Sequence, residues 1–145
     1  MKQKLNCVLL IDDDEPTNFM SNMILEEADC TNHIQIVQSA KKALDYLSSP
    51  IDLHNEQTSH PYPELIFLDI NMPAMNGWEF LERYSQLKQN DAQRPIIIML
   101  TTSINPDDQL KAEKTPWIDG FENKPLTSKM VEKVMAKYFQ EYQIK

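Results

Sequence analysis

The chain is poor in cysteine and glycine, and it lacks a long apolar run. Its two cysteines, Cys7 and Cys30, have neither the CxxC spacing nor the nearby histidines of a zinc site, so we expect them to be free thiols. No apolar stretch approaches the roughly 20 residues that cross a bilayer, and the run at 8–11 is far shorter than the core of a secretory signal. These absences predict a cytoplasmic protein without membrane insertion.

Basic residues are also outnumbered, with 14 lysines and arginines against 22 acidic residues and a net charge of −8. A duplex-binding domain needs clustered cations that displace counterions from phosphates, so we expect no direct contact with nucleic acid. The 145 residues, 41% of them hydrophobic, suffice for one buried core. We predict a single domain over residues 1–145, with its core at about 5–139 and a loop insertion at about 48–64.

Short apolar runs alternate with amphipathic segments, a pattern typical of α/β proteins with a parallel sheet. The expected strands lie at 8–11, 33–38, 65–68, 96–100 and 120–123. Five parallel strands joined by right-handed crossovers fit two doubly wound orders, a Rossmann-like one and the flavodoxin-like order 2-1-3-4-5.

The helices between these strands have recognisable starts, marked by Pro16 in a first turn and by the capping residues Ser39, Asn105 and Thr127. In the first helix, the apolar stripe is expected to face the core and the polar side to face solvent. The stripe consists of Phe19, Met20, Met23 and Ile24, and the polar side carries Glu15, Asn18 and Asn22.

Charged and polar residues follow four of the expected strands. Asp12 and Asp13 follow the first strand and Asp69 the third, while Thr101 follows the fourth and Lys124 the fifth. Ligands of doubly wound folds bind beyond the carboxyl ends of the central strands, so we expect these side chains to meet at one rim of the sheet.

Such a cluster predicts a metal-dependent phosphoryl acceptor. Two unit charges about 4 Å apart repel by about 4 kcal/mol at an effective dielectric of about 20, so three carboxylates need a compensating cation or must take up protons. Oxygen ligands without cysteine or histidine favour Mg²⁺. A carboxylate beside Mg²⁺ can attack a phosphoryl group and form an acyl phosphate. The ammonium of Lys124 and the hydroxyl of Thr101 would then contact the transferred oxygens.

These motifs resemble those of the CheY-like receiver family of response regulators, over about residues 5–139. The matching segments are the acidic pair in Leu10-Ile11-Asp12-Asp13, the phosphoacceptor loop Leu68-Asp69-Ile70-Asn71-Met72-Pro73 with Gly77, the switch threonine in Leu100-Thr101-Thr102, and Lys124-Pro125. Because that family has the flavodoxin-like order, the resemblance implies an α/β three-layer sandwich with a five-stranded parallel sheet in the order 2-1-3-4-5.

The resemblance also implies a role for each matched residue. Asp69 would accept the phosphoryl group. Asp13, Asp69 and the backbone carbonyl of Asn71 would bind Mg²⁺ directly, and Asp12 would act mostly through water. Thr101 and Lys124 would contact the phosphoryl oxygens.

Three further features follow from the resemblance. Phe121 stands at the family's rotating aromatic position, so it would turn inward when Thr101 moves toward the phosphoryl group. The Lys124–Pro125 peptide bond would be cis. Gly77 and Gly120, the only glycines, fall where the family has glycine, and we expect both at positions that need glycine's backbone freedom.

The chain departs from the family pattern at Thr102, which replaces a smaller residue beside Asp69, and at Glu122, where an aliphatic side chain normally points inward. The long loop at 48–64 is a third departure; it contains His54, Glu56 and His60, for which metal binding is a minor alternative. None of the three removes a candidate site residue.

The implied function is a stand-alone receiver domain without enzymatic activity beyond its own dephosphorylation. Its phosphoryl donor would be a sensor histidine kinase or a histidine phosphotransfer protein. The chain ends soon after the last helix, so we expect output by protein contact, through target binding or phosphoryl shuttling.

Two other readings stay open. One is a haloacid-dehalogenase-like phosphohydrolase, suggested by Asp12-Asp13-Asp14, although Pro16 stands where that family needs Thr or Val and the Asp69 loop is left unexplained. The other is a pseudo-receiver that binds partners without phosphorylation.

Overall fold

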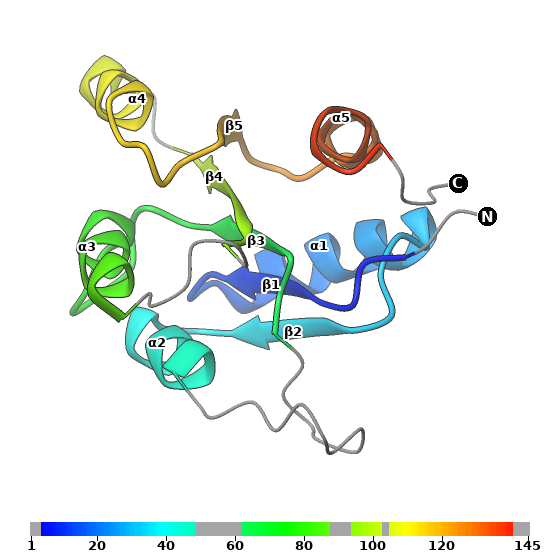
Figure 1. Cartoon of the computed structure of the whole chain (residues 1–145), viewed down its shortest axis with the longest axis horizontal. Coiled ribbons are helices and arrows are strands. Elements are labelled where there is room, and N and C mark those ends of the chain that lie inside the picture. The colour runs from blue at the N-terminus through cyan, green and yellow to red at the C-terminus, as the bar shows by residue number, and fades with distance from the viewer. Residues whose placement is uncertain (1–3, 49–61, 88–93, 103–104, 141–145) are drawn as a thin grey trace.

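The computed structural model describes residues 4–48, 62–87, 94–102 and 105–140, in which strands and helices alternate along the chain as predicted (Figure 1). The strands are β1 (Val8–Ile11), β2 (Ile34–Val37), β3 (Leu65–Leu68), β4 (Ile96–Thr101) and β5 (Gly120–Asn123). The helices are α1 (Glu15–Ala28), α2 (Ala40–Ser48), α3 (Gly77–Leu87), α4 (Pro106–Glu113) and α5 (Ser128–Tyr138). The predicted insertion lies largely outside the described residues, together with its candidate metal ligands.

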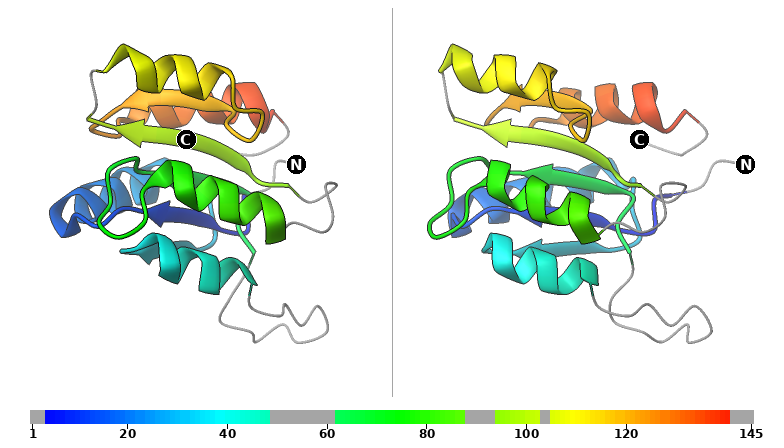
Figure 2. Two further views of the ribbon diagram at one scale, coloured as in Figure 1. Left: turned by 90° about the vertical axis from the view of Figure 1, so that its left-hand side faces the viewer. Right: turned by 60° about the vertical axis from the view of Figure 1, so that its left-hand side comes forward.

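The strands form one parallel sheet in the order β2-β1-β3-β4-β5, which confirms the predicted topology. Helices α2 and α3 cover one face and α1 and α5 cover the other (Figure 1). Figure 2 shows that all strands point the same way, so their carboxyl ends share one edge. Among the described helices, none is both long and apolar enough to span a membrane.

The central strands are buried on both faces, as their uninterrupted apolar sequences predict. Alternate residues of β1 point to opposite sides, so Leu9 and Ile11 pack with α2 and α3, whereas Val8 and Leu10 pack with α1 and α5. Cys7 and Cys30 are buried and free, as expected.

Ile24 packs partly against the core as predicted, but the rest of the predicted core face of α1 is wrong. Its buried residues are Asn18, Ser21 and Leu25, while Phe19, Met20 and Met23 are 66%, 57% and 47% exposed. Asn18 tolerates burial because its side-chain amide donates to the backbone carbonyl of Asp12 at 2.9 Å. A hydrogen-bonded asparagine therefore lies on the core side of α1, and an apolar stripe faces outward.

The predicted helix starts are confirmed. Ser39 Oγ accepts the backbone N–H of Lys42 at 3.1 Å before α2, and Asn105 Oδ1 accepts the N–H of Asp107 at 2.9 Å at the start of α4. Thr127 caps α5, and Pro16 lies in the first turn of α1.

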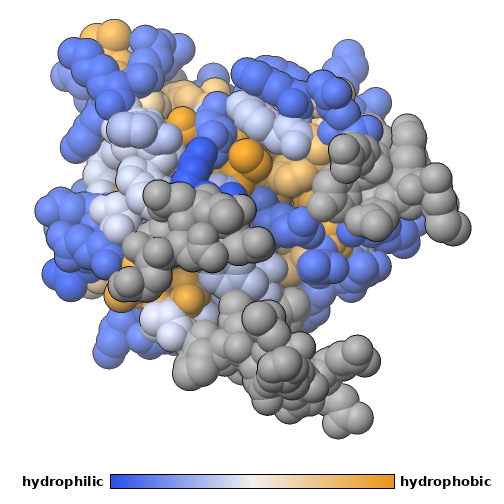
Figure 3. Space-filling view, viewed as in Figure 1, coloured by the Kyte–Doolittle hydropathy of each residue, from blue (hydrophilic) through white to orange (hydrophobic). Residues whose placement is uncertain are grey.

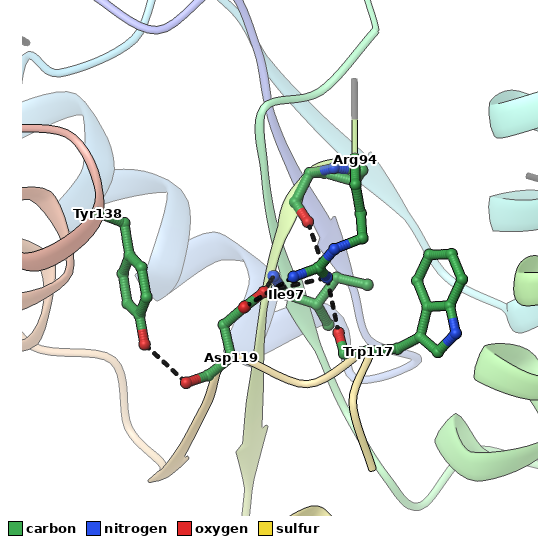
Figure 4. A network of polar contacts seen from close by, with 6 residues as sticks. Arg94, Ile97, Trp117, Asp119 and Tyr138 are labelled. Atoms are coloured by element: carbon green, nitrogen blue, oxygen red, sulfur yellow. Dashed lines mark hydrogen bonds and ion pairs between the residues drawn. The ribbon is translucent and has the colours of Figure 1, made fainter. Parts of the chain in front are cut away.

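A polar cluster joins the amino ends of β4 and β5 to α5 (Figure 4). Arg94 Nη2 lies 2.9 Å from Asp119 Oδ1, and Arg94 Nη1 donates to the carbonyl of Trp117 at 3.2 Å. The hydroxyl of Tyr138 donates to the carbonyl of Asp119 at 2.6 Å. These contacts fix the α4–β5 connection at the edge of the sheet opposite the predicted site.

The unusual Glu122 is accommodated because β5 is an edge strand. Its carboxylate lies 2.8 Å from Lys133 Nζ of α5, where the pair is partly exposed. Figure 3 shows hydrophilic side chains over α4 and α5, with hydrophobic ones between these helices.

Candidate functional site

The acidic side chains predicted to meet do so at the carboxyl edge of the sheet. Parallel pairing sets Ile11 level with Leu68, and the N–H of Asp69 donates to the carbonyl of Ile11 at 2.9 Å. Carboxylate oxygens of Asp12, Asp13 and Asp69 then all lie within 4.8 Å of one another. No other cluster of three potential metal-ligating side chains occurs in the described part of the chain.

Lys124 projects into this acidic cluster from the end of β5. Its Nζ lies 2.5 Å from Asp12 Oδ2 and 3.3 Å from Asp69 Oδ1, and its side chain is only 12% exposed. Its backbone N–H donates to the carbonyl of Thr101 at 2.8 Å, which ties β5 to the end of β4. The Lys124–Pro125 bond is cis, as the resemblance implied.

Burial and charge shift the pKa of both groups. Burial, and then the charge of Asp12, raise the pKa of Asp69 to about 6, although Lys124 and a hydrogen bond from the backbone of Asn71 oppose this. For Lys124, burial lowers the pKa, but the hydrogen bond and charge of Asp12 and the charge of Asp69 outweigh it and raise the pKa overall. The charged form of Asp69 is thus disfavoured even with Lys124 beside it, and a further cation would stabilise it.

The remaining predicted site residues differ in how deeply they are buried. Thr101 is fully buried at the end of β4, and Phe121 of β5 is partly buried against the core on the α2–α3 side. Asn71 is exposed in the loop after β3. The Mg²⁺-binding role of its carbonyl stays a prediction.

Gly77 is required for a different reason from the expected one. Neither glycine has a positive φ; the positive values belong to Asp29 and Ala74. At Gly77 an added Cβ would lie 2.6 Å from the carbonyl oxygen of Asp69, so glycine is needed for close packing of α3 on the loop after β3. At Gly120 the added Cβ would meet the end of the flexible Ile98 side chain at 2.8 Å.

Two positioning residues escaped prediction. The amide of buried Asn18 holds the backbone of Asp12, and the backbone N–H of Asp14 donates to Asp12 Oδ1 at 2.9 Å. Together they fix Asp12 where β1 turns into α1. The available signal was an asparagine six residues after Asp12, directly before the apolar pair Phe19-Met20.

The donor set suits a hard divalent cation. Three carboxylates gather without histidine or cysteine, and the ammonium of Lys124 balances only part of their charge. Asp12 and Asp69 are nearly buried, whereas Asp13 is exposed and leaves the cluster open to an ion from solvent. These residues therefore fit Mg²⁺, with Asp13 on the open side.

Known proteins share both the sequence pattern and the fold. A two-component response regulator from Cytophaga hutchinsonii has 34% sequence identity and a TM-score of 0.82, covering 96% of this chain and all of that one. Response regulator Rcp1 from a Synechocystis species is 30% identical over 70% of this chain, which spans 65% of its length. A solved structure described as the Mn²⁺-bound form of Rcp1 has a TM-score of 0.71 at 23% identity, covering 97% of this chain and 99% of that one.

The family model for the response regulator receiver domain matches residues 8–136, nearly the whole described chain. That range includes both acidic residues after β1, the loop after β3 and the lysine after β5. The protein is therefore a member of the response regulator receiver family of two-component signalling.

Proposed function

We propose that this chain is a single receiver domain that accepts a phosphoryl group on Asp69, with Mg²⁺ as cofactor, in a two-component phosphorelay. The observation that carries the proposal is the nearly buried carboxylate of Asp69, with Asp12 and Asp13 beside it and the ammonium of Lys124 at 3.3 Å. Bound Mg²⁺ would supply charge neutralisation at the transferred oxygens.

The proposed step is a phosphoryl transfer between two side chains. A carboxylate oxygen of Asp69 forms a bond to phosphorus as the bond from phosphorus to the donor's histidine nitrogen breaks, and the imidazole leaves with that electron pair. Lys124 stabilises the negative charge on the transferred oxygens, since its raised pKa keeps it protonated. Asp13, Asp69 and the carbonyl of Asn71 would hold the ion, with Asp12 acting mostly through water.

The product would act as a switch. Phosphorylation adds roughly −1.5 to −2 charge and strong acceptor oxygens at Asp69. Thr101 would turn its hydroxyl toward these oxygens, and Phe121, on the adjacent strand, would fill the space it leaves. Output follows as a changed contact with a target protein, or as transfer of the phosphoryl group onward.

The partner-docking surface is proposed on α1, on the side that carries its exposed apolar residues. Asn18 is buried and cannot contact a partner, whereas Phe19, Met20 and Met23 present an exposed apolar stripe directly after the acidic cluster. Such a stripe suits the helical surface of a kinase or phosphotransfer domain, which must bring its phosphohistidine to Asp69.

Labelling by acetyl phosphate tests the proposal. We expect stoichiometric, Mg²⁺-dependent labelling of the wild type and none of Asp69→Asn. Asp13→Asn should lose most of the Mg²⁺-dependent labelling. Asp14→Asn should keep this labelling, because Asp14 caps α1 and asparagine caps a helix equally well.

Two outcomes of that experiment would favour the rival readings. Catalytic turnover of a generic phosphomonoester, without lasting label, would favour a phosphohydrolase. A folded wild-type protein that takes up no label with Mg²⁺ would favour a receiver that binds partners without phosphorylation.

A further inference from the structure

Helix α4 is weakly anchored to the rest of the domain. Only Ala112 of its residues is buried, and Leu110 is 52% exposed. A groove of about 310 Å³ separates α4 from α3, with Leu81 and Trp78 on one side and Lys111 on the other. α4 therefore has space to shift relative to α3.

One α3 side chain bridges this groove. The indole N–H of Trp78 donates to Asp108 Oδ1 at 3.3 Å, and Lys111 Nζ lies 4.8 Å from the centre of the same ring. A hydrogen bond and a cation–π contact thus converge on one indole and hold α4 against α3. Both contacts are at the rim of the domain, where they can break without opening the core.

The same tryptophan is coupled to the phosphoacceptor loop. Trp78 follows Gly77, whose N–H donates to the carbonyl of Ile70 at 2.8 Å and at which an added Cβ would lie 2.6 Å from the carbonyl oxygen of Asp69. With no room between Gly77 and Asp69, a shift of the backbone at Asp69 and Ile70 must move the start of α3.

We propose that Trp78 is a latch: its contacts with Asp108 and Lys111 hold α4 in place while Asp69 is unphosphorylated, and phosphorylation releases them. The inference rests on the proposed function of Asp69. The route runs through the β3–α3 loop and is separate from the one through Thr101.

Titration of the full chain with beryllofluoride and Mg²⁺, followed by NMR, tests the latch. The chain has two tryptophans, so Trp78→Phe assigns the two indole N–H signals. The test variant is Asp108→Ala and its matched control is Asp107→Ala. Both remove an acid from the exposed first turn of α4, but only Asp108 contacts the indole.

We expect beryllofluoride to move the Trp78 indole signal in the wild type to the position it already holds in Asp108→Ala. The same variant should bind beryllofluoride roughly two- to tenfold more tightly than the wild type, because a contact that favours the unphosphorylated state is gone. Asp107→Ala should match the wild type in both respects.

The latch is overturned if beryllofluoride shifts the backbone signals of the Asp69 loop while the Trp78 indole signal stays in place, or if the two alanine variants behave alike. Failure of the wild type to bind beryllofluoride at all would instead overturn the proposed function, and the latch with it. Thermal unfolding of each variant verifies that it is folded.

Discussion

At the residue scale, the site combines a buried carboxylate with too little positive charge. The pKa of Asp69 is raised to about 6 by burial and by Asp12, which means that ionisation at neutral pH works against folding. Lys124 offsets the negative charge of Asp69 only in part, since it also forms an ion pair with Asp12 at 2.5 Å. The site favours a further cation because its carboxylates carry more negative charge than Lys124 balances.

Asp69→Asn should therefore be more stable than the wild type at pH 7 without Mg²⁺. Between 3.8 and about 6 the folded protein binds more protons at Asp69 than the unfolded chain does, so the wild type loses stability as pH rises through this window. We expect the variant to gain about 1–3 kcal/mol in free energy of unfolding at pH 7 and almost nothing below pH ~4. Urea unfolding across pH measures both values; a constant difference would contradict the account.

Gly77→Ala tests the close packing behind Asp69. Its Cβ would meet backbone, which cannot yield as a side chain can, so we expect a loss of about 1–3 kcal/mol in unfolding free energy. Gly120→Ala is the matched control, because its Cβ meets only the tip of Ile98. Equal losses measured in urea would show that backbone proximity to Asp69 is not what requires glycine.

At the element scale, features that depend on neighbouring residues could be predicted from the sequence, and features that depend on tertiary contacts could not. Caps such as Asn105 and Thr127 depend on neighbouring residues alone, so their prediction was correct. The proximity of Asp12 and Asp69 was predicted because both follow parallel strands, whose carboxyl ends share one edge of the sheet. The predicted core face of α1 was wrong because hydrophobic periodicity cannot show that Asn18 has a hydrogen-bond partner, the carbonyl of Asp12, which lets it be buried. The groove beside α4 also had no signal, since it depends on how two helices are spaced.

The exposed stripe on α1 should matter for the donor protein and not for stability. We expect Phe19→Ser to lower the rate of phosphotransfer from the source organism's histidine kinases or phosphotransfer proteins at least tenfold, because ~1.4 kcal/mol of lost apolar contact is tenfold. Acetyl phosphate labelling should not change. Leu110→Ser, which alters a similarly exposed residue on α4, is the control, and equal effects of the two variants on phosphotransfer would contradict this assignment.

The polar cluster around Arg94 should contribute to stability where a surface ion pair does not. Arg94→Met removes bonds to Asp119 and to a backbone carbonyl, and we expect it to cost about 1–3 kcal/mol in free energy of unfolding. Lys133→Met breaks the more exposed pair with Glu122 and should cost less than Arg94→Met, because solvent screens this pair. Chemical denaturation measures the loss of stability in both variants. A larger loss for Lys133→Met than for Arg94→Met would contradict this prediction.

At the scale of the whole molecule, the fold brings residues from the ends of four strands to one edge of a parallel sheet. No single motif accounts for the site: Asp12 and Asp13 come from one crossover, Asp69 from a second, and Lys124 from beyond β5. Helices α1 and α3 both start at this edge. Helix α1 carries the exposed apolar stripe, and α3 carries Trp78, which contacts α4. A charge added at Asp69 therefore lies close to the starts of both α1 and α3.

Peptide mapping by mass spectrometry after treatment with acetyl phosphate and Mg²⁺ tests the central claim most directly. The account predicts one added phosphoryl group per chain, carried by the peptide that contains Asp69 and absent when Mg²⁺ is chelated. Phosphoryl groups on another residue, such as Asp12 or Asp13, or an unmodified Asp69 in a folded protein, would contradict it.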